Sequence, residues 1–321
     1  MLRPEDIRIA RKLIGNLVER TPVVYSQYLS HLCDAEVYLK LENRQITKSF
    51  KIRGALNKML NLSSVQRKRG VVTASAGNHA QAVAMAAERL GIPACIMVPR
   101  STPQIKLAGI KQYSVELQIV GEIYDEAEQA AIELAKRKKL TFISPYNDRF
   151  VIAGQGTIGL EILEDLDELN TIIVPVGGGG LISGIALAVK SVKPEIKLVG
   201  VQSVASPVMY ESLKAGKIIS MTVAESIADG LHGGVEARSI TFDLVQDYVD
   251  ELLLVEEATI KKAIYLLAEK EHQIVEGAGA TPVALLLEHR ERWKRQRVVA
   301  ILSGGNIQEE QLTSILSSEH V

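Results

Sequence analysis

The chain is organised around one stretch, Gln-Ile-Thr-Lys-Ser-Phe-Lys-Ile-Arg-Gly-Ala at residues 45–55. It follows a short β-branched and aromatic run at residues 37–41 and precedes a pattern with apolar residues at helical spacing. Its two lysines, Lys48 and Lys51, therefore stand between a predicted strand end and a predicted helix start. Most lysines are simply solvated. A lysine at a helix N-terminus is mildly unfavourable, however, which is a small indication that an anion or an unusual pKa is involved.

Residues 49–55 resemble the cofactor-lysine motif of the fold-type II pyridoxal-phosphate (PLP) enzymes. The branch they resemble most is that of the serine/threonine dehydratases (threonine ammonia-lyases) and the serine racemases. Four further motifs match the same family, so the resemblance covers nearly the whole chain. It implies that Lys51 forms the internal Schiff base with PLP and that Phe50 lies at the cofactor site. The family usually has glycine in place of Lys48, so the local backbone conformation and the charge near the phosphate stay open.

The composition is that of a globular protein, with 47% hydrophobic and 23% charged residues in a chain of 321. This length is enough for two domains that share a large buried core. A net charge of −1 gives no electrostatic case for nucleic acid or an anionic membrane. The two cysteines form no disulfide or metal pattern, and no apolar run reaches the ~18 residues that span a bilayer. Because the N-terminus has no signal-peptide core, we expect a soluble, cytoplasmic protein.

Strand and helix patterns alternate along most of the chain, which predicts parallel sheets. No linker separates the halves, so intertwined domains are expected. The resemblance implies an α/β fold like that of the tryptophan synthase β subunit, with two three-layer, parallel-sheet domains. It places a large PLP-binding domain at residues 1–48 plus 147–321 and a small substrate-side domain at residues 49–146. The predicted strands are 37–41, 71–74, 94–98, 115–120, 142–143, 172–176, 197–202, 252–255 and 298–302, and the predicted helices are 4–19, 78–90, 103–109, 124–138, 181–189, 208–215, 260–269 and 281–288.

A Ser-Ala-Gly-Asn-His-Ala turn at residues 75–80 follows a predicted strand and opens a predicted helix. Free backbone N–H groups and the helix dipole bind anions at such a place. A turn with an Asn N-cap and no ligand would have the same sequence pattern. The resemblance implies that this turn lines the substrate carboxylate site and that Asn78 bonds the ring oxygen of the cofactor. His79 as a general base is less favoured than a structural role. The residues concerned are Ser75, Ala76, Gly77, Asn78 and His79.

Ala76 separates two activities within the family. Serine racemases resemble this turn but carry a serine there, which exchanges a proton on the face opposite the lysine. Alanine cannot transfer a proton. The sequence therefore favours a dehydratase that uses only the lysine side.

Two glycine-rich segments differ in how strongly they indicate a ligand-binding site. Gly-Gln-Gly-Thr-Ile-Gly at 154–159 has the spacing of a dinucleotide fingerprint, but the run before it is short and no acidic ribose ligand follows ~20 residues on. The resemblance implies that it is a structural helix start instead. Four glycines at 177–180 leave a loop whose exposed N–H groups can wrap a phosphate. Because consecutive glycines cost conformational entropy on folding, we expect a ligand that must approach the backbone of this loop closely. By resemblance, Gly177, Gly178, Gly179, Gly180 and Leu181 form the phosphate cup for PLP.

Two later motifs complete the expected site. The resemblance places Glu276 close to the cofactor ring and gives Ser303 a hydrogen bond to the pyridine nitrogen. A hydroxyl does not hold a proton on that nitrogen as a carboxylate would, so the electron sink is weaker and suits prompt loss of a β-hydroxyl. Asp229 reads as a turn-former. Gln202 stands where serine racemases carry a glutamate that binds a divalent cation, so no metal site is predicted.

The predicted activity is that of a PLP-dependent ammonia-lyase, which converts L-threonine or L-serine to a 2-oxo acid and ammonia by β-elimination. The expected partner is a small hydroxy-amino acid, with no nucleic acid and no membrane, and the expected assembly is a homodimer or homotetramer. The alternatives are a dehydratase for phenylserine, 3-hydroxyaspartate or a hydroxyectoine-pathway intermediate, a serine racemase, and a catalytically silent ligand-binding protein. The preferred substrate, activation by a cation or nucleotide, and the effect of Lys48 stay open.

Overall fold

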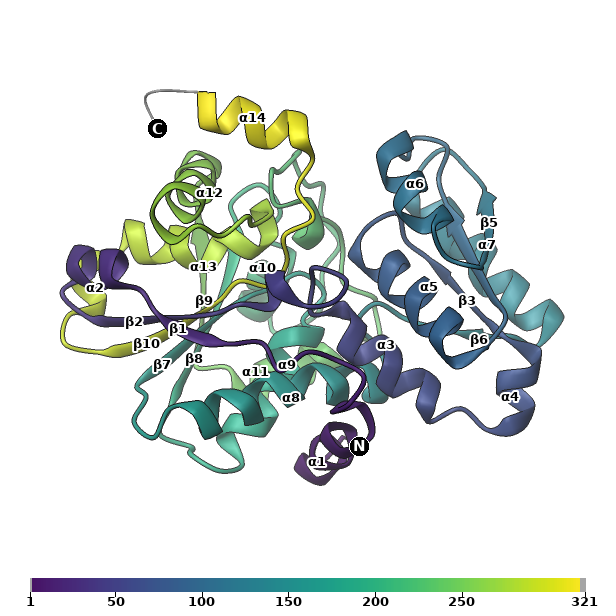
Figure 1. The fold of residues 1–321 in the computed structure, drawn as a ribbon, viewed down its shortest axis with the longest axis horizontal. Helices are drawn as coiled ribbons and strands as arrows, with labels where there is room; N and C mark the ends of the chain where they lie inside the picture. Colours follow the sequence, from purple (N-terminus) through teal and green to yellow (C-terminus); the bar gives the residue numbers. More distant parts are fainter. Residues whose placement is uncertain (1, 318–321) are drawn as a thin grey trace.

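A computed structural model describes residues 2–317, apart from the side chain of Ile105. The chain forms two lobes, each built on its own sheet, and the smaller lobe lies on the right in Figure 1. The larger sheet has the strand order β1-β2-β10-β7-β8-β9, and the smaller has the order β5-β4-β3-β6. Every strand pair is parallel except β1 with β2. The expected α/β architecture with parallel sheets is confirmed.

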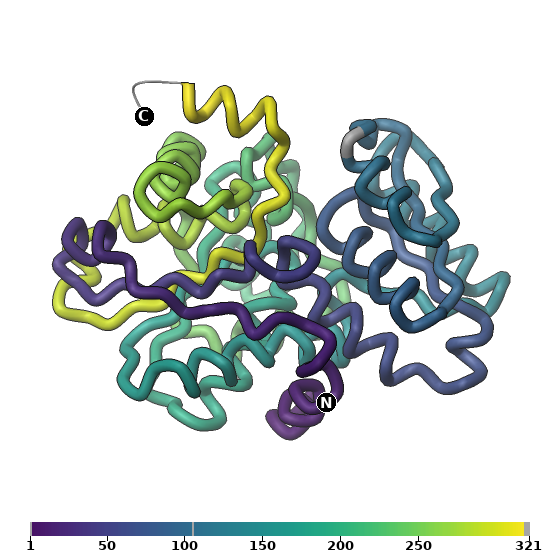
Figure 2. Tube along the Cα trace, viewed as in Figure 1, coloured from purple at the N-terminus to yellow at the C-terminus, as the bar shows by residue number. Residues whose placement is uncertain are grey.

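The larger sheet is buried between two helical layers. One hydrophobic core joins it to α2, α12 and α13, and another joins it to α8, α9 and α11. The N-terminal strand segment and the C-terminal strand β10 lie side by side, as Figure 2 shows, because β10 pairs with β2. The strands are β1 (Val23–Tyr25), β2 (Glu36–Lys40), β7 (Thr171–Pro175), β8 (Lys197–Ser203), β9 (Glu251–Val255) and β10 (Arg297–Ile301). The helices are α1 (Pro4–Ile14), α2 (Gln27–Cys33), α8 (Arg149–Asp165), α9 (Gly180–Lys190), α10 (Val208–Ala215), α11 (Ile240–Tyr248), α12 (Glu257–Glu271), α13 (Gly277–Glu288) and α14 (Glu309–Ser317).

The smaller sheet has the same layered construction. Its inner face packs on α5 with α3, and its other face packs on α7. The strands are β3 (Val71–Ala74), β4 (Ala94–Val98), β5 (Glu116–Ile119) and β6 (Thr141–Phe142), and the helices are α4 (Ser64–Arg69), α5 (Asn78–Leu90), α6 (Gln104–Lys111) and α7 (Tyr124–Lys138). Among the described residues, no helix combines the length and the apolar character that crossing a bilayer needs.

Helix α3 (Lys51–Leu60) lies at the junction of the lobes, where it packs against α8 of one and α5 of the other. Its buried side chains Ile52, Leu56 and Met59 belong to the core of the smaller lobe. The helix that starts at Lys51 is therefore fixed from both sides. We propose the domain boundaries 1–48 plus 147–321 and 49–146, and the allocation of strands to the two sheets supports them.

The bounds of β3, β4, α5, α7 and α10 agree with the sequence prediction. The bounds of the other predicted strands and helices differ by one to four residues, and the largest of these differences is at α13, which starts at Gly277 rather than at residue 281. Two further predictions are wrong. The first helix ends at Ile14 rather than at residue 19, because the chain turns at Gly15. Residues 154–159 lie inside α8 and not at a helix start.

Glycines in α8 allow close helix packing. A Cβ on Gly154 would lie 2.5 Å from the carbonyl oxygen of Arg53 in α3, and one on Gly156 would lie 2.8 Å from that of Gly184 in α9. The fingerprint-like spacing in this segment therefore serves contacts between helices.

Candidate active site

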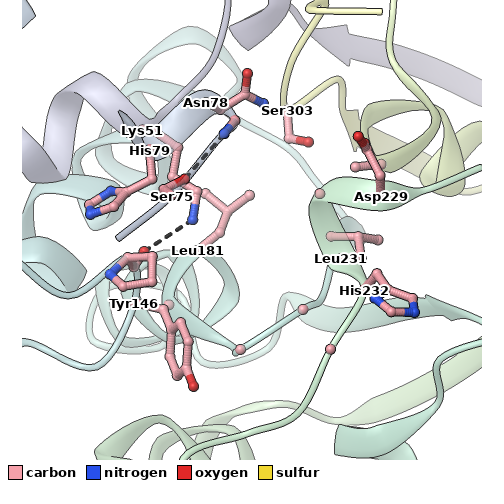
Figure 3. Close-up of a pocket in the computed structure, with 18 of the residues that line it drawn as sticks. Lys51, Ser75, Asn78, His79, Tyr146, Leu181, Asp229, Leu231, His232 and Ser303 are labelled. Atoms are coloured by element: carbon pink, nitrogen blue, oxygen red, sulfur yellow. Dashed lines mark hydrogen bonds between the residues drawn. The ribbon is translucent and has the colours of Figure 1, made fainter. Parts of the chain in front are cut away.

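A cavity of about 580 Å³ is lined by residues of both lobes. In Figure 3, Asn78 and Ser303 lie above the Lys51 amino group and Tyr146 lies below it. Every residue predicted for the site lines this cavity: Phe50, Lys51, Ser75, Ala76, Gly77, Asn78, His79, Gly177, Gly178, Gly179, Gly180, Leu181, Glu276 and Ser303.

Lys51 presents its amine to the cavity from the first turn of α3. Its Nζ donates a hydrogen bond of 3.0 Å to the carbonyl oxygen of Pro145 and lies 5.1 Å from the centroid of the Phe50 ring. Burial lowers the pKa of Lys51 from 10.5 to about 8, and the nearby Glu276 carboxylate partly offsets this. An appreciable fraction of the amine is therefore neutral, and able to accept a proton, near neutral pH.

Lys48 lies outside the cavity lining, and its side chain is exposed. Its φ of 54° is in the left-handed region, where glycine has no steric penalty and other residues are uncommon. This conformation accounts for the glycine that the family prefers at this position. The Lys48 carbonyl accepts a hydrogen bond of 2.8 Å from the N–H of Gly305, which ties this turn to the loop after β10.

The turn at residues 75–79 joins β3 to α5, and the first N–H groups of α5 have no partner within the helix. Ser75 Oγ accepts a hydrogen bond of 3.2 Å from the N–H of Gly77. His79 is buried, and its Nε2 lies 3.0 Å from the carbonyl oxygen of Ile143. Burial, together with the nearby charge of Lys51, lowers the pKa of His79 from 6.5 to about 3. A neutral imidazole bonded to a backbone carbonyl holds the turn in place, so its geometry does not favour a general base.

Asn78 is held from two sides. Its Nδ2 donates to Glu276 Oε1 at 2.7 Å, and its Oδ1 accepts from Asn306 Nδ2 at 2.6 Å. Burial and the nearby charge of Asp229 together raise the pKa of Glu276 to about 7, although the hydrogen bond from Asn78 acts in the opposite direction. The start of α5 in the small sheet lobe and the start of α13 in the large one are thus joined by side chains inside the cavity.

The conformation of the glycine loop at residues 177–180 depends on neighbouring side chains as well as on the backbone flexibility of glycine. Gly179 has a φ of +84°, and a Cβ on Gly178 would lie 2.5 Å from the Tyr146 ring. Thr241 Oγ1 donates a hydrogen bond of 2.6 Å to the carbonyl oxygen of Gly178. The loop ends at Gly180, the first residue of α9, so bare N–H groups and a helix N-terminus meet at one place.

Ser303 follows β10 and is buried, with 2% of its surface exposed. Its carbonyl accepts a hydrogen bond of 3.1 Å from the N–H of Phe50, and Ser49 forms an isolated bridge with Gly304. The backbone that carries Ser303 is thereby bonded to the backbone that carries Lys51.

Arg53, two residues after Lys51, lies in a buried charge cluster. Its guanidinium bonds Glu42 at 2.8 and 2.9 Å and Glu161 at 2.7 and 3.0 Å. Lys40 Nζ donates to Glu161 at 2.7 Å, so two cations and two carboxylates balance one another. Although burial alone would raise the pKa of Glu42, the Arg53 guanidinium holds it below its usual value. The cluster fixes the first turn of α3 to β2 and α8.

Several cavity residues were not predicted from the sequence. They include Gln81, Lys106, Tyr124, Glu128, Tyr146 and Glu236. Asp229 does begin a short turn, η2 (Asp229–Leu231), but it also lines the cavity and pairs with Lys106 at 2.8 Å. None of these residues stands in a motif with local spacing, and only the folded chain brings them together.

Gln202 has partners of its own in this structure. Its Oε1 accepts a hydrogen bond of 2.8 Å from the N–H of Tyr210, and its Nε2 donates to the carbonyl oxygen of Ser206 at 3.4 Å. Within residues 2–317, no group of three or more His, Cys, Asp or Glu side chains could hold a metal ion.

Comparison with known proteins finds one matching family and several similar enzymes. Residues 14–304 match the family described as "Pyridoxal-phosphate dependent enzyme". An L-threonine ammonia-lyase of Thermotoga maritima is 45% identical over 99% of this chain and 79% of its own length. A maize serine racemase structure superposes with a TM-score of 0.93 at 36% identity, covering 98% of this chain and 96% of the racemase. The processed threonine deaminase isoform 2 of Solanum lycopersicum gives 0.92 at 35% identity, covering 97% and 85% of the two chains.

The cavity residues fit the cofactor that this family uses. A loop of bare N–H groups at a helix N-terminus matches a phosphate group, and the glycines at 177–180 line the cavity without side chains. Lys51 is half-buried and has a lowered pKa, so part of its amine is neutral and able to react with an aldehyde carbon. The buried Ser303 supplies a hydroxyl for a ring nitrogen. On the motif, the cavity and the family match together, the chain belongs to the pyridoxal-phosphate-dependent enzymes and has the fold of their type II branch.

Proposed function

We propose that the chain is an ammonia-lyase that converts L-threonine or L-serine to a 2-oxo acid and ammonia by β-elimination. The observation that carries this proposal is the 45% identity, over 99% of the chain, with an L-threonine ammonia-lyase. The arrangement of Lys51, the 75–79 turn and the glycine loop on one cavity supports it. Threonine would give 2-oxobutanoate, and serine would give pyruvate.

The proposed roles of the cavity residues follow from their chemistry. The N–H groups of residues 177–181 and the N-terminus of α9 would hold the cofactor phosphate. Lys51 would bind the aldehyde carbon, Asn78 the ring oxygen and Ser303 the ring nitrogen. The N–H groups of the 75–79 turn would orient the substrate through its carboxylate.

Lys51 is proposed as the base for the α-proton. When bound, pyridoxal phosphate supplies the electron sink that stabilises negative charge at the substrate α-carbon. The neutral Lys51 amine accepts the proton from that carbon, and its lowered pKa makes the neutral form accessible. The contact with Pro145 keeps the amine in the cavity. The β-hydroxyl, given a proton, would leave as water, and the enamine product would become an imine that water hydrolyses to the 2-oxo acid and ammonia.

Serine racemisation is the second candidate, because the maize serine racemase has the same fold with a TM-score of 0.93. Ala76 argues against it, since alanine at the cavity wall cannot carry a proton on the second face of the substrate. Incubation with L-serine, with D-serine and pyruvate measured together, tests this choice. Pyruvate should far exceed D-serine, and equal rates of formation would favour the racemase.

The substrate panel that tests the main proposal contains L-threonine, L-serine, phenylserine and 3-hydroxyaspartate, with 2-oxo acid as the readout. Turnover of threonine or serine at the highest kcat/KM supports the proposal. An absorption band of protein-bound cofactor without turnover of any member would instead indicate a silent binding protein.

We also propose a cytoplasmic homodimer or homotetramer. The near-neutral charge balance supports a protein without a nucleic-acid or membrane partner. Analytical ultracentrifugation of the holoenzyme tests the assembly.

A further inference from the structure

Asn306, in the loop after β10, joins two other parts of the cavity wall through its side chain. Its Nδ2 donates a hydrogen bond of 3.0 Å to the carbonyl oxygen of Thr47 and one of 2.6 Å to Oδ1 of Asn78. Thr47 lies four residues before Lys51, and Asn78 is the first residue of α5. One amide nitrogen therefore connects the segment that carries Lys51 with the helix start that carries Asn78.

The carbonyl oxygen of Thr47 determines how both amides are turned. A backbone carbonyl can only accept a hydrogen bond, so the Asn306 atom beside it must be the amide nitrogen and not the amide oxygen. The same nitrogen lies 2.6 Å from the Asn78 amide, so the Asn78 atom that it contacts must be the acceptor, Oδ1. The nitrogen of Asn78 is thereby turned toward Glu276, whose Oε1 accepts a hydrogen bond of 2.7 Å from it.

The backbone of the same loop packs against the Asn78–Glu276 pair. A Cβ on Gly304 would overlap Glu276 Oε1 and would lie 3.2 Å from Asn78 Nδ2. The N–H of Glu276 donates a hydrogen bond of 3.1 Å to the carbonyl oxygen of Gly304. The loop at residues 303–306 therefore contacts the pair through its backbone at Gly304 and through the side chain of Asn306.

The observed orientation leaves one donor of Asn78 for a ligand. An amide nitrogen carries two hydrogens, and the bond to Glu276 uses one of them. Because Asn78 lines the cavity, its second N–H is available there. An ionised carboxylate and an ionised ring oxygen are both acceptors, so the amide serves both only with its nitrogen on their side.

We propose that Asn306 is a positioning residue that holds the Asn78 amide with its nitrogen toward the ring oxygen of the cofactor. The proposal rests on the proposed function, which includes the role of Asn78 at that oxygen. A hydrogen bond donated to the ring oxygen favours negative charge there, so the imine nitrogen that joins Lys51 to the cofactor would lose its proton at a lower pH. Asn306 would thus act on the cofactor through Asn78.

The test is a double-mutant cycle of Asn306→Ala and Asn78→Ala, read without substrate. Titration of the apoenzyme with pyridoxal phosphate gives a Kd, and a pH titration of the holoenzyme absorbance gives the midpoint at which the imine loses its proton. Asn78→Ala should raise the Kd about tenfold and the midpoint by about one pH unit, because one hydrogen bond is lost. Asn306→Ala should shift both in the same direction, with a Kd about threefold to tenfold above wild type.

The double variant distinguishes positioning from a separate contribution of Asn306. If Asn306 acts through Asn78, the double variant should match Asn78→Ala to within about twofold in Kd and show the same pH midpoint. Kd increases that multiply in the double variant, or wild-type values in Asn306→Ala, would overturn the proposal. Asn306→Leu, which is close in size and also lacks a donor, replaces Asn306→Ala in the cycle where the alanine variant folds poorly.

Asn43→Ala is the matched control. Asn43 lies against Gly305 of the same loop, and its Nδ2 donates a hydrogen bond of 3.2 Å to the carbonyl oxygen of Ile274, but in the described chain it is outside the cavity lining. The variant should lower the free energy of unfolding and leave the Kd and the pH midpoint at wild-type values. A midpoint shift as large as that of Asn306→Ala would mean that any disturbance of the loop is sufficient, which would also overturn the proposal.

Turnover of L-threonine by the wild type separates this proposal from the proposed function. Turnover together with a cycle in which the two substitutions act independently would overturn the positioning role and leave the proposed function standing. A cycle in which the substitutions are coupled, with no 2-oxo acid from any hydroxy-amino acid, would overturn the proposed function and leave the positioning role. The expected result is turnover together with coupled substitutions.

Discussion

Asn78 donates a 2.7 Å hydrogen bond to Glu276 across the cavity, from the first residue of α5 to the residue before α13. Burial and Asp229 raise the pKa of this carboxyl to about 7, so its neutral form is favoured in the folded state. Between the usual value of 4.5 and about 7, the folded chain binds more proton at this site than the unfolded chain does. Linkage then requires the free energy of unfolding to fall as pH rises through this window.

The first prediction concerns Glu276→Gln in the cofactor-free enzyme. Relative to the wild type, the variant should gain up to about 3 kcal/mol of stability between pH 5 and pH 8, because its amide never becomes a buried charge. Urea unfolding at several pH values measures the difference. Glu269→Gln, an exposed residue on α12, is the control and should show no such trend. A constant difference between Glu276→Gln and wild type across this range would contradict a raised pKa.

The second prediction is that Lys51, and not Lys48, carries the cofactor. Lys51 faces the cavity, whereas Lys48 is exposed and outside its lining. Borohydride reduction of the holoenzyme followed by peptide mapping should label Lys51. Lys51→Ala should abolish elimination, because the base for the α-proton is lost, and Lys48→Ala should retain both label and activity. A label on Lys48 would refute the assignment.

The third prediction concerns the glycine loop. Gly178→Ala would place a Cβ 2.5 Å from the Tyr146 ring, so the ring or the loop must move. We expect the affinity for pyridoxal phosphate to fall by at least about tenfold, or roughly 1.4 kcal/mol. Equilibrium dialysis or absorbance titration of the apoenzyme measures it. Gly109→Ala in α6 is the matched control, because its Cβ meets only the flexible end of Gln81 at 3.4 Å. Equal cofactor affinity in both variants would show that Tyr146 does not shape the loop.

The fourth prediction concerns the buried charges behind α3. Arg53→Met leaves Glu42 and Glu161 buried with Lys40 as the remaining cation of the cluster, which should destabilise the protein by about 3–5 kcal/mol. Arg297→Gln, which breaks exposed pairs with Glu36 and Glu168, should cost less than about 1 kcal/mol. Denaturant unfolding of the two variants compares them. Similar losses would mean that the buried cluster contributes no more than a surface pair.

Much of the fold could be predicted because its signals are local. The apolar runs at β3 and β4 and the helical patterns at α5 and α7 give correct bounds, and the glycine run and the lysine motif are also local. Other features depend on the folded chain. The sequence does not distinguish the buried Arg53 from a surface arginine, because its partners lie on separate elements. For the same reason the presence of Glu128 and Glu236 in one cavity lining could not be predicted, since they belong to segments more than a hundred residues apart.

The last prediction concerns Ser303, which we expect to determine how strongly the cofactor ring withdraws electrons. Ser303 is buried at the end of β10, on backbone that is bonded to Phe50 beside Lys51. Its hydroxyl can donate a hydrogen bond to a neutral ring nitrogen, but it cannot hold a proton there by charge. Ser303→Ala should therefore leave one buried acceptor without its donor. The expected cost is about 1–3 kcal/mol, or about tenfold to a hundredfold in kcat/KM if all of it appears in the transition state.

Ser303→Asp supplies the opposite test of the same contact. A carboxylate would favour a protonated ring nitrogen and strengthen the electron sink, so the absorption spectrum of the substrate-bound enzyme should change and elimination should become slower or less selective. Thr281→Ser, a buried hydroxyl-retaining change in α13 outside the cavity lining, is the control for general disturbance near the site. A carboxylate beside the ring nitrogen must change the electronic state of the ring. An unchanged spectrum and product ratio in Ser303→Asp would therefore mean that the Ser303 hydroxyl does not contact the ring nitrogen. The loop that follows β10 would then need a different role in the site.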